Sequence, residues 1–108
     1  MKYPSWLELL EFFASEPEEI DDIQIYRTTN SLGLCLSVSF DTSDDSFQTA
    51  LSQNESTIAV VSFEKMERMH IEGEELHVSF GFQNPRVRAR VRVSPNILVE
   101  WSGLRTIT

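Results

Sequence analysis

The stretch from about Thr57 to Trp101 constrains the fold more than any other part of the chain, because apolar and polar residues alternate through it between tight turns. A period of two is typical of strands with one buried and one solvated face. Three polar turns divide the stretch, namely Glu72–Glu75, Gln83–Arg86 and Ser94–Asn96. Because strands joined by such short turns pair antiparallel, we predict an antiparallel meander.

The turns also predict the residues that face one another. The predicted apolar pairs are Ile71–Leu76, Met69–Val78, Phe82–Val87, Phe80–Ala89, Val78–Val91, Val93–Ile97, Val91–Val99 and Ala89–Trp101. All of them lie on one face of the sheet. A slip of one residue would turn this apolar row to water, so the pattern specifies the register.

The opposite face of the meander is polar and carries no aromatic side chain. Its predicted residues are His70, His77, Ser79, Gly81, Arg86, Arg88, Arg90, Arg92, Leu98 and Glu100. One interpretation is a solvated face with weak cross-strand ion pairs, such as Arg90 opposite Glu100. Another is a protein interface centred on Arg88 and Arg90, because arginine is favoured at interface centres. RNA binding fits less well, because RNA-binding sheets usually add stacking aromatics.

A helix is predicted before the strands. Ser5 and Glu8 have the spacing of a capping box, and Pro17 marks the end of the helical pattern. The apolar stripe consists of Trp6, Leu9, Leu10 and Phe13. A helix with such a stripe needs an apolar sheet face to cover. We therefore predict an α+β fold, with the helix packed on one face of a mainly antiparallel meander sheet of about six to seven strands.

The segments between the helix and the meander predict three further strands. They are Ile23–Tyr26, Leu32–Phe40 and Thr57–Phe63. The segment 41–56 is acidic, rich in serine and without a clear period, so we predict a loop with at most one helical turn. At 108 residues the chain is expected to form one domain, residues 1–108.

The charge of the chain limits its partners. The formal net charge is -8, which disfavours nucleic acid and anionic membranes as direct partners and favours a basic protein surface. The candidate contact groups on an acidic surface are Glu16, Glu18, Glu19, Asp21, Asp22, Asp41, Asp44 and Asp45. The start of the chain does not resemble a signal peptide, and the lone Cys35 gives no disulfide, so a cytoplasmic monomer is the expectation.

No catalytic constellation is evident in the sequence. It has no G-x-S-x-G elbow, no phosphate-binding glycine loop and no Cys/His cluster. The acidic pairs Asp21–Asp22 and Asp44–Asp45 lack the spacing of a calcium loop. His70 and His77 face each other, but a metal site would need a third ligand. We expect no catalytic residue, no metal and no cofactor.

The order of elements resembles the immunity protein 50 family of bacterial polymorphic-toxin systems. The matching positions are Trp6, Leu10, Phe13, Asp22 before Ile23 and Ile25, Phe63, Met66, Ile71-Glu72-Gly73 and Gln83-Asn84. The chain departs from the family at the entry to the first strand, where Glu19-Ile20-Asp21-Asp22 replaces an aromatic-His-Asp step. A role of that histidine is therefore not transferred to this chain.

The resemblance implies a small cytoplasmic protein that binds and neutralises a cognate toxin, without identifying the toxin. The alternatives are a general protein-interaction module that uses the arginine-rich sheet face, and a hydrolase that reverses a toxin's action with His70 and His77.

Overall fold

The computed structural model describes residues 3–81 and 87–103, and within these residues it contains one helix and nine strands. The elements are α1 (Trp6–Phe13), β1 (Glu18–Ile20), β2 (Ile23–Thr29), β3 (Leu34–Asp41), β4 (Ser46–Gln53), β5 (Ser56–Phe63), β6 (Met66–Glu72), β7 (Glu75–Phe80), β8 (Arg88–Arg92) and β9 (Leu98–Ser102). The sequence prediction of six to seven strands was too low.

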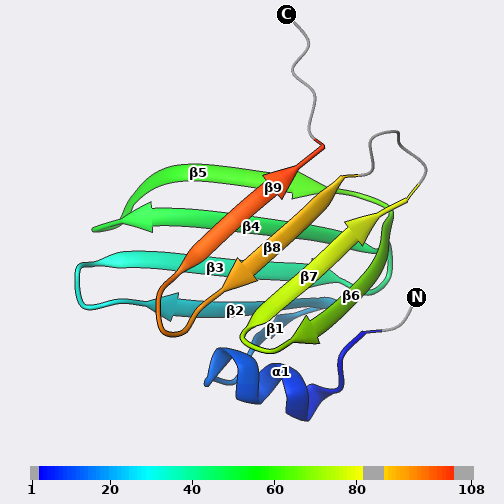
Figure 1. The fold of residues 1–108 in the computed structure, drawn as a ribbon, viewed down its shortest axis with the longest axis horizontal. Helices are drawn as coiled ribbons and strands as arrows, with labels where there is room; N and C mark the ends of the chain where they lie inside the picture. Colours follow the sequence, from blue (N-terminus) through cyan, green and yellow to red (C-terminus); the bar gives the residue numbers. More distant parts are fainter. Residues whose placement is uncertain (1–2, 82–86, 104–108) are drawn as a thin grey trace, which may run out of the picture.

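The strands form two antiparallel sheets that lie face to face and cross obliquely (Figure 1). One sheet has the order β1-β2-β3-β4-β5 and the other the order β6-β7-β8-β9. The predicted antiparallel meander is confirmed, and α+β describes the fold broadly. The prediction of one sheet covered by the helix was wrong, because the five-stranded sheet covers the apolar face of the four-stranded sheet.

Aromatic side chains from both sheets form the centre of the core. Phe80 of β7 packs against Phe47 of β4, with ring centroids 6.2 Å apart, and against Trp101 of β9 at 5.6 Å. The Trp101 Nε1–H also donates a hydrogen bond of 2.9 Å to the hydroxyl of Thr49 in β4, which is buried. These contacts join the two sheets. The hydrogen bond also gives the buried Thr49 hydroxyl the partner that a buried polar group needs.

The helix lies along the side of the sandwich rather than over a sheet face. Its start has the predicted capping box, in which Ser5 and Glu8 bond each other's backbone N–H groups. Only Leu9 and Phe13 are buried, and the Phe13 ring stacks on Tyr26 of β2 at 4.4 Å. Trp6 is 56% exposed, so its prediction as a core residue was wrong. The helix ends at Phe13, before Pro17, through Ala14 at a φ of 54°.

The segment 41–56, predicted as a loop, contains β4. Phe47, Thr49 and Leu51 alternate toward the core, and the two-residue turn Asn54–Glu55 has positive φ at both positions, as tight hairpins require. The strand was missed in the sequence because the polar Thr49 interrupts the apolar alternation that would have predicted it. Similarly, part of the acidic run 16–22 forms the short edge strand β1.

The predicted registers were confirmed in two of the three hairpins. His70 faces His77 in β6–β7, and Arg90 faces Glu100 in β8–β9. Between β7 and β8 the prediction was wrong by two residues, because Val78 faces Ala89. A slip of two keeps every side chain on its own face, so the hydrophobic pattern cannot distinguish the two registers. Phe82, Arg86 and the turn predicted at 83–86 lie outside the described residues.

Candidate functional site

The predicted acidic residues lie on two turns at one end of the five-stranded sheet, on the edge strand β1 that leads to one of these turns, and at Glu16 before that strand. The β1–β2 turn brings Asp21 and Asp22 beside the β3–β4 turn, because Asp41 pairs with Ile23 and the Thr42 N–H donates to the Asp22 carbonyl at 3.4 Å. The antiparallel register therefore joins two acidic segments that are twenty residues apart in the sequence. We call the predicted acidic contact residues Glu16, Glu18, Glu19, Asp21, Asp22, Asp41, Asp44 and Asp45 the acidic end.

Three aspartates of the acidic end accept hydrogen bonds, and for Asp41 and Asp44 these bonds lie within or beside their own turn. Asp41 accepts hydrogen bonds from the backbone and hydroxyl of Ser43, at 2.8 and 2.6 Å, and these bonds lower the pKa of its carboxyl. Asp44 accepts from the Ser46 N–H at 3.1 Å. Asp45 accepts from the Tyr3 hydroxyl, whose pKa is raised by burial and by this bond. Their geometry is fixed, and their charge still contributes to the surface.

The other acidic residues differ in whether they form an ion pair within the chain. Glu18 forms an ion pair with Arg27 of β2. Within residues 3–81 and 87–103, no ion pair engages Glu16, Glu19, Asp21 or Asp22. These four carboxylates are available to a partner, since a solvated carboxylate loses no internal contact on binding.

A hollow of about 880 Å³ extends from the acidic end to the last residues of β5. Asp41 and Asp44 line it on one side, and Glu64 and Lys65, which follow β5, line it on the other. The Met66 N–H donates to the Asp45 carbonyl at 2.8 Å and holds the two segments together. The end of β5 therefore lies beside an excess of negative charge.

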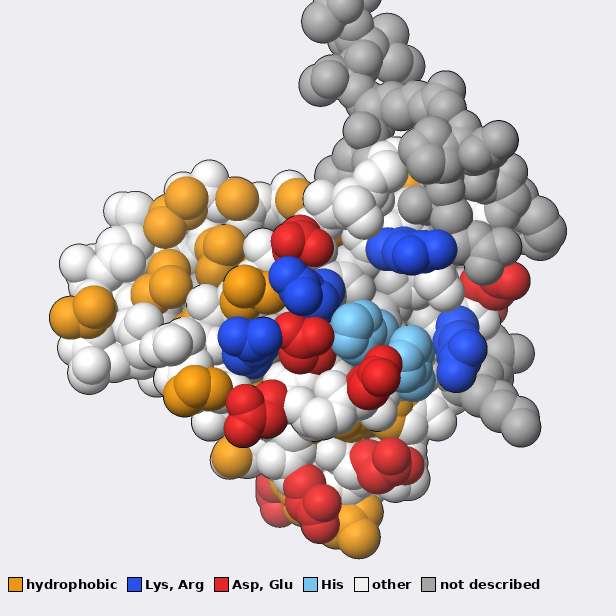
Figure 2. Space-filling model, viewed as in Figure 1, with side chains coloured by type: hydrophobic (Ala, Val, Ile, Leu, Met, Phe, Trp, Pro, Cys, Tyr) orange, Lys and Arg blue, Asp and Glu red, His pale blue; other side chains and the backbone are white. Residues whose placement is uncertain are grey.

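The outer face of the four-stranded sheet carries the second candidate site. Figure 2 shows acidic, basic and histidine side chains interleaved on this face. Glu75 is their centre: its carboxylate accepts from Arg92 at 2.6 Å, and it lies 3.5 Å from Arg90 and 3.3 Å from His77. The bond from Arg92, assisted by the charge of Arg90, lowers the pKa of Glu75. Arg90 also bonds Glu100 at 3.1 Å.

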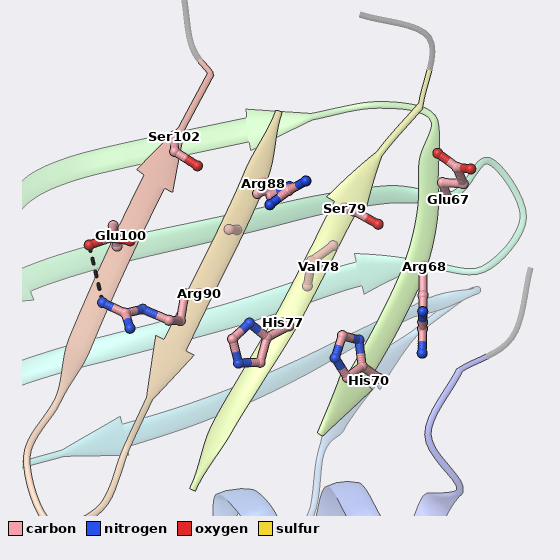
Figure 3. A pocket seen from close by; sticks show the side chains of 11 residues that line it. Glu67, Arg68, His70, His77, Val78, Ser79, Arg88, Arg90, Glu100 and Ser102 are labelled. Atoms are coloured by element: carbon pink, nitrogen blue, oxygen red, sulfur yellow. Dashed lines mark hydrogen bonds and ion pairs between the residues drawn. The ribbon is translucent and has the colours of Figure 1, made fainter. Parts of the chain in front are cut away.

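A hollow of about 540 Å³ lies next to this network (Figure 3). His70 and His77 form one wall, with their rings stacked 5.2 Å apart, and Arg68 and Arg88 lie beside them. In the described part of the chain no ion pair engages Arg68 or Arg88. The hollow therefore presents cationic groups on a chain that is acidic as a whole.

The structure brings together some predicted residues and separates others. Arg88 and Arg90 share the outer face, but Arg90 already forms ion pairs with the carboxylates of Glu75 and Glu100. Sequence reasoning missed Glu75 as the centre of the network and Arg68 as a wall of the hollow. The position of Arg68 on this face was predictable, because it lies two residues before His70 and alternate residues of a strand point to the same face. Among the described residues, no three His, Cys, Asp or Glu side chains are placed to hold a metal ion.

Comparison with solved structures shows that the fold is shared with another protein. A chain of the contact-dependent growth inhibition toxin–immunity protein complex from Klebsiella pneumoniae 342 superposes with a TM-score of 0.81, covering 93% of this chain and 94% of that chain at 23% identity. The fold is shared with a component of a toxin–immunity complex. The likeness agrees with the sequence resemblance to an immunity-protein family. The sequence matches no family model and no curated protein.

The described residues contain no helix that could cross a membrane, since α1 has eight residues where a spanning helix needs about 20.

Proposed function

We propose that this chain is an immunity protein that binds a cognate toxin domain and neutralises it without catalysis. The observation that carries the proposal is the shared fold, which extends over nearly the full length of both chains and comes from a toxin–immunity complex. The resemblance of the sequence to the immunity protein 50 family points to the same function. A fold alone does not fix a function, so the surface must supply the mechanism.

The acidic end supplies the partner surface in this proposal. Its carboxylates converge from two turns and one edge strand, and four of them have no internal ion pair in the described chain. A basic patch on the toxin would be attracted at long range, which raises the association rate and makes it sensitive to salt. Carboxylates can also occupy positions that a toxin's active site keeps for anionic substrate groups. Inhibition then needs binding alone.

The first experiment is protection of cells. A toxin domain, to be sought in the reading frame immediately upstream, is expressed with and without the chain, and survival is counted. We expect full protection by the wild type and by the His70→Ala/His77→Ala variant, because the proposed inhibition uses no imidazole. Protection that is lost only in the histidine variant would support the hydrolase alternative. No protection by the wild type would overturn the proposal.

Charge reversal then locates the surface. The triple variant Glu19→Lys/Asp21→Lys/Asp22→Lys should lower the association rate with the purified toxin by about 10-fold or more at low salt, because steering by charge contributes factors of this size. The matched control reverses Glu11 of α1 together with Glu72 and Glu74 at the β6–β7 turn, so that both triple variants change the net charge by the same amount. Equal effects of the two variants would mean that total charge, rather than the acidic end, controls binding.

The alternative function is a general interaction module that uses the outer arginine face. It is favoured by Arg88, which lines the 540 Å³ hollow and has no ion pair within the described residues. Arg88→Glu/Arg90→Glu should abolish complex formation if this face binds the partner, and should leave binding intact if the acidic end does. The two charge-reversal variants therefore give opposite results under the two functions.

A further inference from the structure

The five-stranded sheet ends at β5, and its last edge is open. β5 pairs with β4 on one side, and no other described strand pairs with it. Its eight residues, Ser-Thr-Ile-Ala-Val-Val-Ser-Phe, include no charged side chain, and the first five are exposed. Ile58 is 60% exposed and Val60 is 54% exposed. An edge of this kind presents unpaired backbone groups to any strand that approaches.

The other sheet edges in the described chain are protected, and β5 is not. β1 has three residues, two of them glutamates. β6 carries Glu67, Arg68 and Glu72, together with a register irregularity near its start. β9 carries Glu100. Short length, charge and irregular pairing are the usual protections of an edge against unwanted pairing. β5 has only the irregularity at Ile58, which leaves the five residues from Ala59 to Phe63 in regular pairing with β4.

The apolar character of β5 continues onto the neighbouring surface. Figure 2 shows hydrophobic side chains gathered over the ends of β3, β4 and β5, beyond the area that the four-stranded sheet covers. Leu51 of β4 is partly buried there beside the exposed Ala59. A partner strand on the open edge would find backbone groups to bond and apolar surface to cover.

We infer that the open edge of β5 receives an extended strand of the toxin, which adds to the five-stranded sheet as a sixth strand. The inference rests on the proposed function and names its contact. The incoming strand should be apolar opposite Ile58 and Val60. A basic strand is favoured by the net charge of -8 and by Glu55 and Glu64, which flank β5 at its two ends.

A second copy of the chain is a poorer occupant of this edge. Antiparallel self-pairing over all eight residues of β5 would place Glu55 of one copy opposite Glu64 of the other, at both ends of the strand pair. Like charges directly opposite destabilise a strand pair. Each copy also carries a net charge of -8, so the copies repel each other, whereas a basic toxin is attracted.

Amide hydrogen exchange tests the inference directly. Exchange is measured in the free chain and in its complex with an inactivated form of the cognate toxin domain. We expect the amides of β5 that face the open edge to exchange fast in the free chain and slowly in the complex, while those of β9 stay unchanged. If a complex forms and β5 exchange is unaltered, this inference is overturned and the proposed function stands. If no complex forms, both fall.

Variants at Val60 test whether β5 pairs with a strand of the toxin or only lies near the toxin. Val60→Lys should weaken the complex at least 10-fold, since a lysine on an edge strand opposes pairing, and Val60→Thr should bind as the wild type does. Leu7→Lys, at a residue of α1 that is 56% exposed, is the matched control for an added lysine. Equal affinity of Val60→Lys and the wild type would refute the inference. Light scattering of the free chain at increasing concentration would reveal a dimer, and a dimer with β5 amides protected would assign the edge to a second copy.

Discussion

Truncation of Phe80 should disturb the packing between the two sheets more than any other substitution. Its side chain is fully buried, and its ring lies 6.2 Å from Phe47 and 5.3 Å from Phe63 of the five-stranded sheet, and 5.6 Å from Trp101 of its own sheet. Phe80→Ala would open a cavity between the sheets. Such truncations lower the free energy of unfolding by about 3–5 kcal/mol, which is a large share of the roughly 5–15 kcal/mol of a typical domain.

The assay is urea unfolding at 25 °C, followed by circular dichroism and by tryptophan fluorescence. Leu32→Ala is the control, because an exposed turn residue should change the free energy of unfolding by less than about 0.5 kcal/mol. A double-mutant cycle with Phe47→Ala should show a coupling of about 0.5–1.5 kcal/mol, since the two rings touch across the sheets. A loss below about 1 kcal/mol for Phe80→Ala, or no coupling with Phe47, would refute the face-to-face packing of the sheets.

Two further predictions concern polar groups. Thr49→Val keeps the side-chain shape but removes the acceptor of the Trp101 Nε1–H bond, so urea unfolding should show a loss of about 1 kcal/mol. The same substitution should cost less in a Trp101→Phe background, which lacks the donor, and an equal cost in both backgrounds would mean that the bond is unimportant. Arg92 and Arg90 lower the pKa of Glu75 in the folded chain. The ionised Glu75 carboxylate therefore stabilises the fold above the ordinary glutamate pKa of about 4.3, and this contribution is lost as the pH falls below that value and through the lowered pKa. Thermal melts from pH 7 to pH 3 should therefore show a smaller acid loss for Glu75→Gln than for the wild type, and parallel curves would contradict the role of the network.

The sequence predicted what depends on local pattern. The capping box at Ser5 and Glu8, the pairing of His70 with His77 and that of Arg90 with Glu100 all follow from spacing within a few residues, and the structure confirms them. Two of the three hairpin registers were predictable for the same reason. The β7–β8 register was not, because a shift of two residues preserves the apolar face.

What the sequence could not show depends on contacts between distant residues. β4 was missed because Thr49 is polar at a core position, and its partner Trp101 lies 52 residues away. The second sheet was missed for the same reason, since the helix was the only cover that the sequence offered for the meander. The charges of the acidic end were visible, but their convergence from two turns needed the pairing of β2 with β3.

The central claim is that this chain inhibits a toxin by binding it, and the stoichiometry of inhibition tests that claim most directly. The purified cognate toxin domain is titrated with the chain by calorimetry, and residual toxin activity is measured on the same mixtures. Inhibition by binding predicts a complex of fixed stoichiometry and activity that falls in proportion to the chain added, reaching zero at the same molar ratio. Loss of all activity at a small fraction of that ratio, or no heat of binding, would contradict the claim.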